Sequence, residues 1–199
     1  MRAINIDDLR AAAKRRLPRV IFEFIDGGAQ DETTLRANRE DFQKWRFRTR
    51  TLTDVCTRDQ SITLFGQRYA SPLILAPTGL AGLLSRRGEL AAARAAEKYG
   101  VPYCLSTMST CTIEEITHET APPKWFQLYV LRDRELTKDF IERARTAHCT
   151  ALVLTVDTKV QGPRERDMRN GFTVPPRFSA ATIMDFARHF SWLLDVGLG

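Results

Sequence analysis

The sequence lacks the features that assign a protein to a metal-binding, secreted or membrane-spanning class. Its four cysteines, Cys56, Cys104, Cys111 and Cys149, include no Cys-x-x-Cys pair and no zinc-ligand spacing, so we expect reduced thiols and no metal site. No uninterrupted apolar run approaches the roughly 20 residues that a membrane-spanning helix needs. The N-terminus, MRAINIDDLRAAAKRRLP, is charged throughout and has no apolar signal segment. We therefore expect a cytoplasmic protein, for which a peripheral membrane contact stays open.

The charge of the chain also lacks the pattern of a nucleic-acid-binding protein. Its 30 basic and 24 acidic residues give a net charge of +6, but the excess is spread over short clusters such as Lys14-Arg15-Arg16. No basic stripe alternates with aromatic residues and no DNA or RNA motif is present, so we expect no nucleic acid partner. A solvated basic face is the favoured interpretation, and binding of an anionic cofactor or substrate is the second. With 199 residues, 43% of them hydrophobic, the chain can bury a substantial core.

The first 70 residues predict a small helical preface and a hairpin. Capping residues and the spacing of apolar side chains predict helices over residues 5–16, 18–26 and 31–42. Residues 61–70, SITLFGQRYA, alternate around a Phe65-Gly66-Gln67 turn and predict a β-hairpin.

From residue 73 onward, short apolar segments alternate with helical ones. Strands are predicted at 73–76, 101–105, 125–129 and 151–156, with helices between them at 87–98, 112–118 and 134–147. This order predicts right-handed β-α-β units, a parallel sheet and an α/β fold class. Leu152, Val153, Leu154 and Val156 are apolar on both alternating faces, which predicts a last strand buried on both sides.

Polar residues gather where each predicted strand ends. The four strands end in Pro77-Thr78-Gly79, in Ser106-Thr107, in Gln127 with Tyr129, and in Thr155 with Asp157. In such folds ligands bind at the carboxyl ends of the strands. Any one of these groups would be ordinary capping, but hydroxyls, an amide, a phenol and a carboxylate delivered to one rim indicate a binding site.

The residue types at this rim suit an organic ligand. Thr, Ser and Gln side chains present neutral donors and acceptors, which match the edge of a heterocycle and offer little to a metal. Gly79 allows a ligand to approach the backbone closely. The alternative interpretation of Asp157 is that it caps the next turn and binds no ligand. Arg164 offers a planar fork for a carboxylate or phosphate, and an ion pair with Glu165 or Asp167 explains it equally well.

Five segments carry a more specific signal. They are FEFIDGGAQDETTLRAN at 22–38, LILAPTGLAGL at 73–83, LSTMST at 105–110, WFQLYV at 125–130 and LTVDTKVQGPRERDMRNGF at 154–172. In order and spacing they resemble the FMN-dependent α-hydroxy-acid oxidising family, which includes glycolate oxidases, L-lactate dehydrogenases and mandelate dehydrogenases. The resemblance implies a TIM (β/α)8 barrel, of which this chain would hold the first four β/α units. It divides the chain into N-terminal helices and hairpin (1–72), the first half of the FMN-binding barrel (73–178) and a mobile loop or membrane-contact tail (179–199).

The resemblance also implies a cofactor site. FMN would lie against the backbone of Pro77-Thr78-Gly79, and Ser106, Gln127 and Thr155 would hydrogen-bond its ring. Gly79 resembles the mandelate dehydrogenase branch, since the oxidases more often have alanine there. This favours a quinone or another acceptor over oxygen as the electron sink.

The implied substrate is a small 2-hydroxy acid such as lactate or mandelate, oxidised to the 2-oxo acid. Tyr129 and Arg164 would face it, with Arg164 pairing with its carboxylate. Asp157 would orient and charge-stabilise a histidine base that deprotonates the hydroxy acid. Phe24 departs from the family, which has a tyrosine there whose hydroxyl helps to hold the carboxylate. Loss of such a bond costs about 1.5–3 kcal/mol, so carboxylate binding is expected to be weaker or differently arranged.

The second departure is that the family's base histidine and the other residues of the second half-barrel have no counterpart here. None of the three histidines, His118, His148 and His189, matches the base histidine of the family. We therefore expect a fragment, a cleaved chain or one subunit of a split enzyme, inactive alone and completed by the C-terminal half-barrel of the same or a second chain. The complete enzyme is expected to be a homo-oligomer. Two alternatives stay open: a half-barrel that binds without turnover, and a different barrel enzyme that acts on a phosphorylated substrate.

The last 21 residues, SAATIMDFARHFSWLLDVGLG at 179–199, predict an amphipathic helix. In the mandelate and lactate dehydrogenase branch the corresponding region contacts the membrane. The same residues could equally face a protein core, so the peripheral contact on the inner face of the membrane is an expectation from the resemblance.

Overall fold

The structure, a computed structural model, describes residues 3–121, 124–158, 160, 162–172 and 179–197. Residues 173–178, at the end of the predicted barrel segment, and 198–199 of the predicted tail lie outside the described residues. The chain forms two compact units: unit 1 comprises Met1–Asp54 and Val160–Gly199, and unit 2 comprises Val55–Lys159. The three-segment division predicted from the resemblance stays a prediction.

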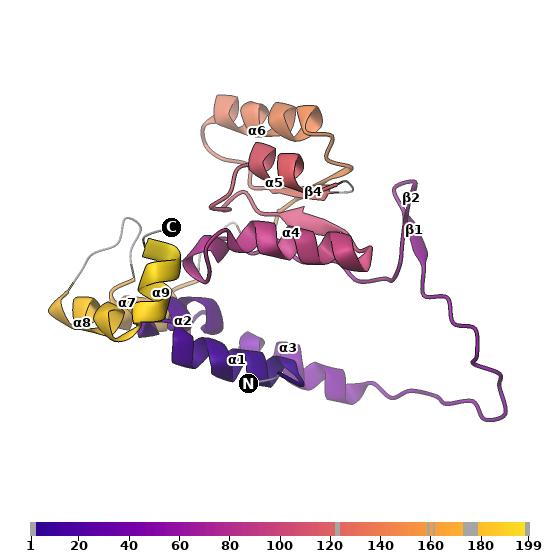
Figure 1. The fold of residues 1–199 in the computed structure, drawn as a ribbon, viewed down its shortest axis with the longest axis horizontal. Coiled ribbons are helices and arrows are strands. Elements are labelled where there is room, and N and C mark those ends of the chain that lie inside the picture. The colour runs from indigo at the N-terminus through magenta and orange to yellow at the C-terminus, as the bar shows by residue number, and fades with distance from the viewer. Residues whose placement is uncertain (1–2, 122–123, 159, 161, 173–178, 198–199) are drawn as a thin grey trace. The chain divides into compact units, whose positions relative to one another are not determined.

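Unit 1 is helical throughout its regular structure in the described residues. Its elements are α1 (Ile6–Arg16), α2 (Arg19–Asp26), α3 (Thr33–Glu40), the 3₁₀ turn η1 (Asp41–Lys44), α7 (Glu165–Asn170), α8 (Ala180–Arg188), α9 (Phe190–Trp192) and the π turn η3 (Leu193–Gly197) (Figure 1). The three predicted N-terminal helices are confirmed. The helix predicted over 31–42 is split, because its last turn tightens into η1.

Local signals explain where the first two helices begin and end. Asn5 caps α1 by accepting the Asp8 backbone N–H at 2.8 Å, and basic residues fill the last turn, where the helix dipole favours them. Pro18 precedes α2, whose Val20, Ile21 and Phe22 are buried. Gly27 ends α2, and a Cβ there would lie 2.6 Å from the Glu23 carbonyl oxygen. A glycine is therefore required at this helix end.

Unit 2 contains the predicted hairpin and three of the four predicted strands of the β-α-β units, which are confirmed, whereas residues 73–76 form only an isolated bridge. Its elements are β1 (Ile62–Leu64), β2 (Gln67–Tyr69), the 3₁₀ turn η2 (Ala81–Leu83), α4 (Gly88–Tyr99), β3 (Tyr103–Leu105), α5 (Ile113–Glu119), β4 (Lys124–Leu128), α6 (Arg134–Thr146) and β5 (Ala151–Leu154). The strands β3, β4 and β5 pair in parallel in that order. Each crossover contains one helix, as parallel pairing requires.

The two faces of this sheet are covered by different elements. Helices α4, α5 and α6 pack side by side in chain order and bury the face that carries Leu105, Phe126 and Leu128 (Figure 1). On the opposite face, Cys104 and Trp125 pack against Tyr69 of the hairpin. The indole of Trp125 donates to the Tyr69 hydroxyl at 3.3 Å, which satisfies both buried polar groups. The hairpin thus closes the non-helical face toward the amino ends of the strands.

Two of the four predicted strands are less buried than their sequences suggest. Leu152 and Leu154 of β5 are 46% and 51% exposed, so the prediction that this strand is buried on both sides is wrong for the described chain. These side chains share the face covered by helices, but α6 packs against β4 and no described helix of unit 2 follows β5. Residues 73–76 make one parallel bridge, Leu75 to Tyr103, and Leu73 is 66% exposed. Both segments lie at the edges of the described sheet, which explains their exposure.

Candidate functional site

Three polar side chains form a hydrogen-bonded row across the carboxyl ends of three neighbouring strands. Ser106 Oγ donates to Gln127 Oε1 at 3.4 Å, and Gln127 Nε2 donates to Thr155 Oγ1 at 2.8 Å. Ser106 and Gln127 are buried, and Thr155 is half-buried. The structure therefore brings together the three residues that the resemblance assigns to the cofactor ring.

The alternation of strand side chains explains why these three residues meet. Cys104 pairs in register with Trp125, and Gln127 pairs with Val153. Ser106, Gln127 and Thr155 each lie two residues beyond one of these positions, so they point to the same non-helical face, one step nearer the carboxyl ends. The hairpin side chains fill this face at one end of the strands, and the polar row occupies it at the other.

The orientation of the Gln127 amide follows from its neighbours. The backbone N–H of Thr107 lies 3.1 Å from the amide atom that also meets Ser106, and because an N–H can only donate, that atom is the oxygen. The nitrogen therefore faces Thr155. Gln127 Nε2 carries a second hydrogen besides the one given to Thr155, and the Thr155 hydroxyl carries a hydrogen of its own. The row can thus offer N–H and O–H donors to an acceptor edge of a ligand.

Tyr129 lies just beyond the end of β4, and Asp157 lies three residues beyond the end of β5. The Tyr129 backbone N–H donates to Thr107 Oγ1 at 3.1 Å, and that hydroxyl donates to the Gln127 carbonyl at 2.5 Å. Thr107 therefore fixes the chain where β4 ends. The Tyr129 side chain is half-buried, and Asp157 is exposed.

The loop that carries Pro77, Thr78 and Gly79 is attached to the Ser106 loop through Met108. The backbone N–H of Leu80 donates to the Met108 carbonyl at 2.9 Å, and the Met108 N–H donates to Ser106 Oγ at 3.1 Å. A Cβ added at Gly79 would lie 3.0 Å from Met108 Cβ, so this glycine allows the two loops to approach closely. Pro77 and Thr78 are exposed.

Glu89 is a residue of this region that sequence reasoning missed. It lies in the first turn of α4, where an acidic residue reads as an exposed partner of the helix dipole, yet it is 0% exposed. Burial raises its pKa, but hydrogen bonds from Thr110 and Ala81 outweigh that effect and hold the pKa of Glu89 below its usual value. Its neighbours Gly88 and Thr110 gave no signal of this contact in the sequence.

Phe24 and Arg164 lie together in unit 1. The Arg164 guanidinium sits over the Phe24 ring, 5.2 Å from its centroid, and Phe24 stacks on Phe172 with centroids 4.3 Å apart. Arg164 Nη2 donates to the carbonyl of Phe24 and, at 3.0 Å, to that of Gly27. Arg164 Nε donates to Asp167 at 2.6 Å, so the ion pair considered as an alternative does form. The structure therefore places this guanidinium beside the α2 position where the family has its tyrosine.

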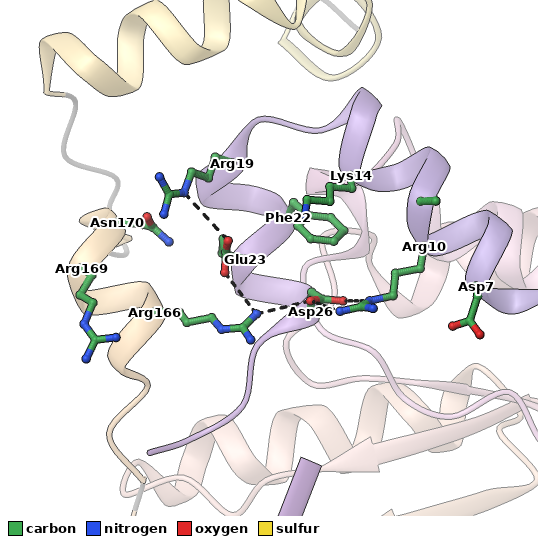
Figure 2. A pocket seen from close by; sticks show the side chains of 11 residues that line it. Asp7, Arg10, Lys14, Arg19, Phe22, Glu23, Asp26, Arg166, Arg169 and Asn170 are labelled. Atoms are coloured by element: carbon green, nitrogen blue, oxygen red, sulfur yellow. Dashed lines mark hydrogen bonds and ion pairs between the residues drawn. The ribbon is translucent and has the colours of Figure 1, made fainter. Parts of the chain in front are cut away.

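Helix α7, next to Arg164, is held to α2 by a network of ion pairs. Figure 2 shows Arg166 pointing toward Glu23 and Asp26 of α2, with Arg10 of α1 on the far side of Asp26. Arg166 Nη1 lies 3.2 Å from Glu23 and 3.4 Å from Asp26, and its Nη2 lies 2.6 Å from Glu32. The Arg10 guanidinium, 2.5 Å from Asp26, holds the pKa of that carboxyl below its usual range. Arg166, in unit 1, is the second residue that sequence reasoning missed.

Of these side chains, Arg10, Glu23, Asp26 and Arg166 line an open groove of about 630 Å³ between α1, α2 and α7 (Figure 2). Arginines and carboxylates alternate along it and pair with one another, so its charge is largely compensated within unit 1. The ion pairs in this groove therefore join α1, α2 and α7 within unit 1. In the described part of the chain, no three His, Cys, Asp or Glu side chains gather in a way that could hold a metal ion.

Comparisons with known proteins agree on one family. Residues 13–197 match the model of the FMN-dependent dehydrogenase family. The chain is 47% identical over 191 residues to the L-lactate dehydrogenase of Vibrio parahaemolyticus and 49% identical over 191 residues to that of Caulobacter vibrioides. Each alignment covers 96% of this chain and 50% of the relative. The chain therefore spans about half the length of the curated relatives it matches.

The structural comparison points the same way. A crystal structure of the monotopic membrane protein (S)-mandelate dehydrogenase superposes with a TM-score of 0.94 at 40% identity, over 100% of this chain and 53% of that one. A crystal structure of mandelate oxidase, with (S)-4-hydroxymandelic acid, superposes with a TM-score of 0.81 at 42% identity, over 86% of this chain and 48% of that one. Both solved chains are about twice as long as the part that is matched.

Proposed function

Because this chain belongs to the FMN-dependent dehydrogenase family, we propose that its polar rim binds FMN and that the complete protein oxidises a 2-hydroxy acid to the 2-oxo acid. Lactate, mandelate or a similar small acid is the proposed substrate, in line with the names of the relatives. The family and fold predictions are confirmed: the chain is α/β and holds the first β/α units of a TIM (β/α)8 barrel, with an unclosed sheet.

The observation that carries the proposal is the row Ser106, Gln127, Thr155. Three neutral side chains from three successive strands are hydrogen-bonded to one another, and they keep hydrogens to donate. A flavin ring has carbonyl and nitrogen acceptors along one edge, so the donor set fits it. A phosphate or a metal would instead call for cations or carboxylates, and the row has neither.

The loop at Pro77, Thr78 and Gly79 supports the same proposal. Its residues are exposed or half-buried beside the Ser106 loop, and Gly79 allows this backbone to lie close to Met108 of that loop. When bound, FMN supplies the acceptor of the two electrons that leave the substrate. Everything else in the reaction falls to side chains that bind and orient the acid and hold its proton.

On the substrate side, we assign carboxylate binding to Arg164 and a contact with the hydroxy acid to Tyr129. Asp157 is the proposed orienting partner of the base, and the base histidine itself is expected in the second half of the barrel. Asp157 is exposed, as we expect of a carboxylate whose partner comes from outside unit 2. In unit 1, the Phe24 ring lies beneath the Arg164 guanidinium. The ring lacks the hydroxyl of the family's tyrosine, but it makes a cation–π contact with Arg164.

The proposed partner is the C-terminal half-barrel, in the same or a second chain. Leu73 at one sheet edge, with Leu152 and Leu154 at the other, would be covered by the strands and helices that such a half supplies. A homo-oligomer of the complete enzyme stays a prediction. Gly79 favours a quinone or another non-oxygen acceptor, so the reduced complete enzyme should react slowly with oxygen; rapid peroxide production would contradict that assignment.

The decisive experiment is an FMN titration of the purified chain, followed by quenching of flavin fluorescence and by the visible absorption spectrum. The variant Thr155→Val removes the hydroxyl at nearly constant size and should raise the Kd for FMN about fivefold to tenfold, as expected for one lost hydrogen bond. Thr63→Val is the matched control, because Thr63 is exposed on β1 of the hairpin.

Each outcome of this titration has a distinct meaning. Equal FMN affinity in the wild type and in Thr155→Val would remove the row from the cofactor site. Absence of FMN binding by the wild type, with and without the second half-barrel, would contradict the cofactor assignment itself. A colourless protein that turns over a phosphorylated substrate would favour the other barrel enzyme considered from the sequence. Intact mass and size-exclusion chromatography identify whether a second polypeptide accompanies the chain.

A peripheral membrane contact through the tail is a second proposal, with its own observation. Ile183, Met184 and Phe190 of α8 and α9 are all more than half exposed, although Trp192 beside them is buried. None of the helices in the described residues is long and apolar enough to cross a membrane. The double variant Ile183→Ser, Phe190→Ser should lose co-sedimentation with anionic vesicles, whereas Val130→Ser, an exposed apolar position in unit 2, should not. Equal sedimentation of all three proteins would exclude a membrane role for the tail.

A further inference from the structure

Glu89 supplies a buried carboxylate that the proposed chemistry does not use. Its Oε1 accepts the backbone N–H groups of Ala81 and Thr110, both at 2.9 Å, and its Oε2 accepts the Thr110 hydroxyl at 2.7 Å. Ala81 lies two residues beyond Gly79, and Thr110 lies two residues beyond Met108. One carboxylate therefore joins the loop after the first strand segment to the loop after β3.

The backbone around Glu89 is crowded in a way that requires close approach of these loops. A Cβ at Gly82 would lie 2.2 Å from Thr110 Oγ1, and a Cβ at Gly88 would lie 2.4 Å from the Ala81 carbonyl oxygen. Two residues that precede Glu89 in the chain, Leu80 and Arg87, also have a left-handed backbone conformation, with φ of 55° and 51°. Such conformations cost energy for residues other than glycine and persist only where contacts hold them.

The contacts made by Glu89 continue directly into the proposed cofactor site. Next to Ala81, the Leu80 N–H donates to the Met108 carbonyl, and the Met108 N–H in turn donates to Ser106 Oγ. Ser106 begins the row that runs through Gln127. A displacement of either loop would therefore change the position of the Gly79 backbone relative to the Ser106 hydroxyl.

We propose that Glu89 is a positioning residue, which fixes the 77–83 loop against the 106–111 loop so that both present one surface to the FMN ring. This inference rests on the proposed function, because the ring is the reason that the two loops need a set spacing. A buried carboxylate is costly to desolvate, and an apolar side chain of the same size would fill the space without that cost. Only a carboxylate accepts three donors from two loops at once.

The test compares Glu89→Ala and Glu89→Gln with Ile116→Ala, a core variant on α5 whose side chain is 1% exposed and belongs to the helical face. The thermal midpoint is measured for each, and comparisons are made at equal distance below it. Two readouts follow: the Kd for FMN by fluorescence quenching, and hydrogen exchange of the Ala81 and Thr110 amides without cofactor. Neither readout requires turnover.

Glu89→Ala should raise the Kd for FMN about tenfold and speed exchange at both amides at least tenfold, whereas Ile116→Ala should change neither beyond its effect on global stability. Glu89→Gln should recover most of the affinity, because its amide oxygen can still accept both N–H groups and the Thr110 hydroxyl can turn to accept. An unchanged Kd in Glu89→Ala overturns the inference. If the wild type binds no FMN with or without the second half-barrel, the cofactor proposal fails instead, and the exchange rates alone decide. Unchanged exchange at the two amides then overturns the role of Glu89, and faster exchange retains Glu89 as the residue that joins the two loops.

Discussion

Replacement of Arg166 by methionine should destabilise unit 1 by about 2–3 kcal/mol. The change keeps the length of the side chain and its helix propensity but removes the guanidinium that binds Glu32. The same guanidinium binds Glu23 and Asp26, as Figure 2 shows. Glu32 is the largest contributor, because its side chain is 13% exposed and its bond to Arg166 is the shortest of the three. A hydrogen bond to a charged group contributes about 1.5–3 kcal/mol when it is shielded from water.

The other two carboxylates add less to this figure. Asp26 keeps its bond to Arg10, and Glu23 keeps a weaker contact with Arg19 at 3.9 Å. Arg166 itself is about a third exposed, so solvent screening keeps its bond to Glu32 near the lower end of that range, about 1.5 kcal/mol, and each of the two longer contacts at about 0.5 kcal/mol. The predicted cost therefore does not exceed the lower end of the roughly 3–5 kcal/mol expected for breaking a fully buried ion pair.

Urea unfolding followed by far-ultraviolet circular dichroism measures this loss. Arg169→Met is the matched control on the same helix, since Arg169 pairs with Glu165 where both side chains are exposed, and it should cost less than about 0.5 kcal/mol. A double variant Arg166→Met, Glu32→Gln should be less destabilised than the sum of the single variants, because the buried charge is removed with its partner. Equal unfolding midpoints for Arg166→Met and Arg169→Met would refute the assignment of α7's attachment to this network.

Three further outcomes are expected. Phe24→Tyr should lower the KM for the hydroxy acid in the complete enzyme severalfold through one added hydrogen bond, and an unchanged KM would place Phe24 outside the substrate pocket. The Arg143 guanidinium lowers the pKa of Glu114 to about 2. The pair contributes less than about 1 kcal/mol to stability because it is exposed, and this contribution is present above pH 4.5 and lost as the pH falls through 2. Glu114→Gln should abolish this part of the pH dependence, measured by urea unfolding across that range. Gly82→Ala should destabilise unit 2 by about 1–3 kcal/mol, because its Cβ would overlap the Thr110 hydroxyl, and a thermal midpoint equal to the wild type would contradict that close contact.

The parts of the fold that follow from local pattern were predictable. Pro18 and Gly27 mark the two ends of α2, and the alternation around Gly66 gives the hairpin register that pairs Leu64 with Gln67. The order of strands and helices was sufficient for the parallel sheet, because a β-α-β crossover has one common hand and one common arrangement. What failed was burial at the sheet edges. Leu152 was predicted to be buried because it belongs to an apolar strand. An apolar pattern indicates that a side chain packs against other elements, but it does not show whether those elements belong to the same chain.

The candidate site divides in the same way. The polar row was predictable because Gln127 and Thr155 end apolar strands, where a polar side chain is conspicuous. Glu89 was not, since an acidic residue in the first turn of a helix is common on protein surfaces, and only the fold shows that it faces inward onto Thr110. The role of Arg166 was not predictable for a similar reason. Its three carboxylate partners are spread over residues 23–32, and they come together around Arg166 only after α2 and α3 form.

The segment that joins β5 to α7 links the two kinds of residue on which the proposed chemistry depends. Thr155 and Asp157 belong to the rim of unit 2, and Arg164 belongs to the Phe24 cluster of unit 1. In each case the charged or polar group is oriented by contacts within its own unit: Gln127 for Thr155, and the α2 carbonyls for Arg164. Both groups are therefore oriented before any ligand binds, which reduces the ordering that binding must supply. Asp157 is the exception, because the histidine base that it is proposed to orient is expected from the second half of the barrel.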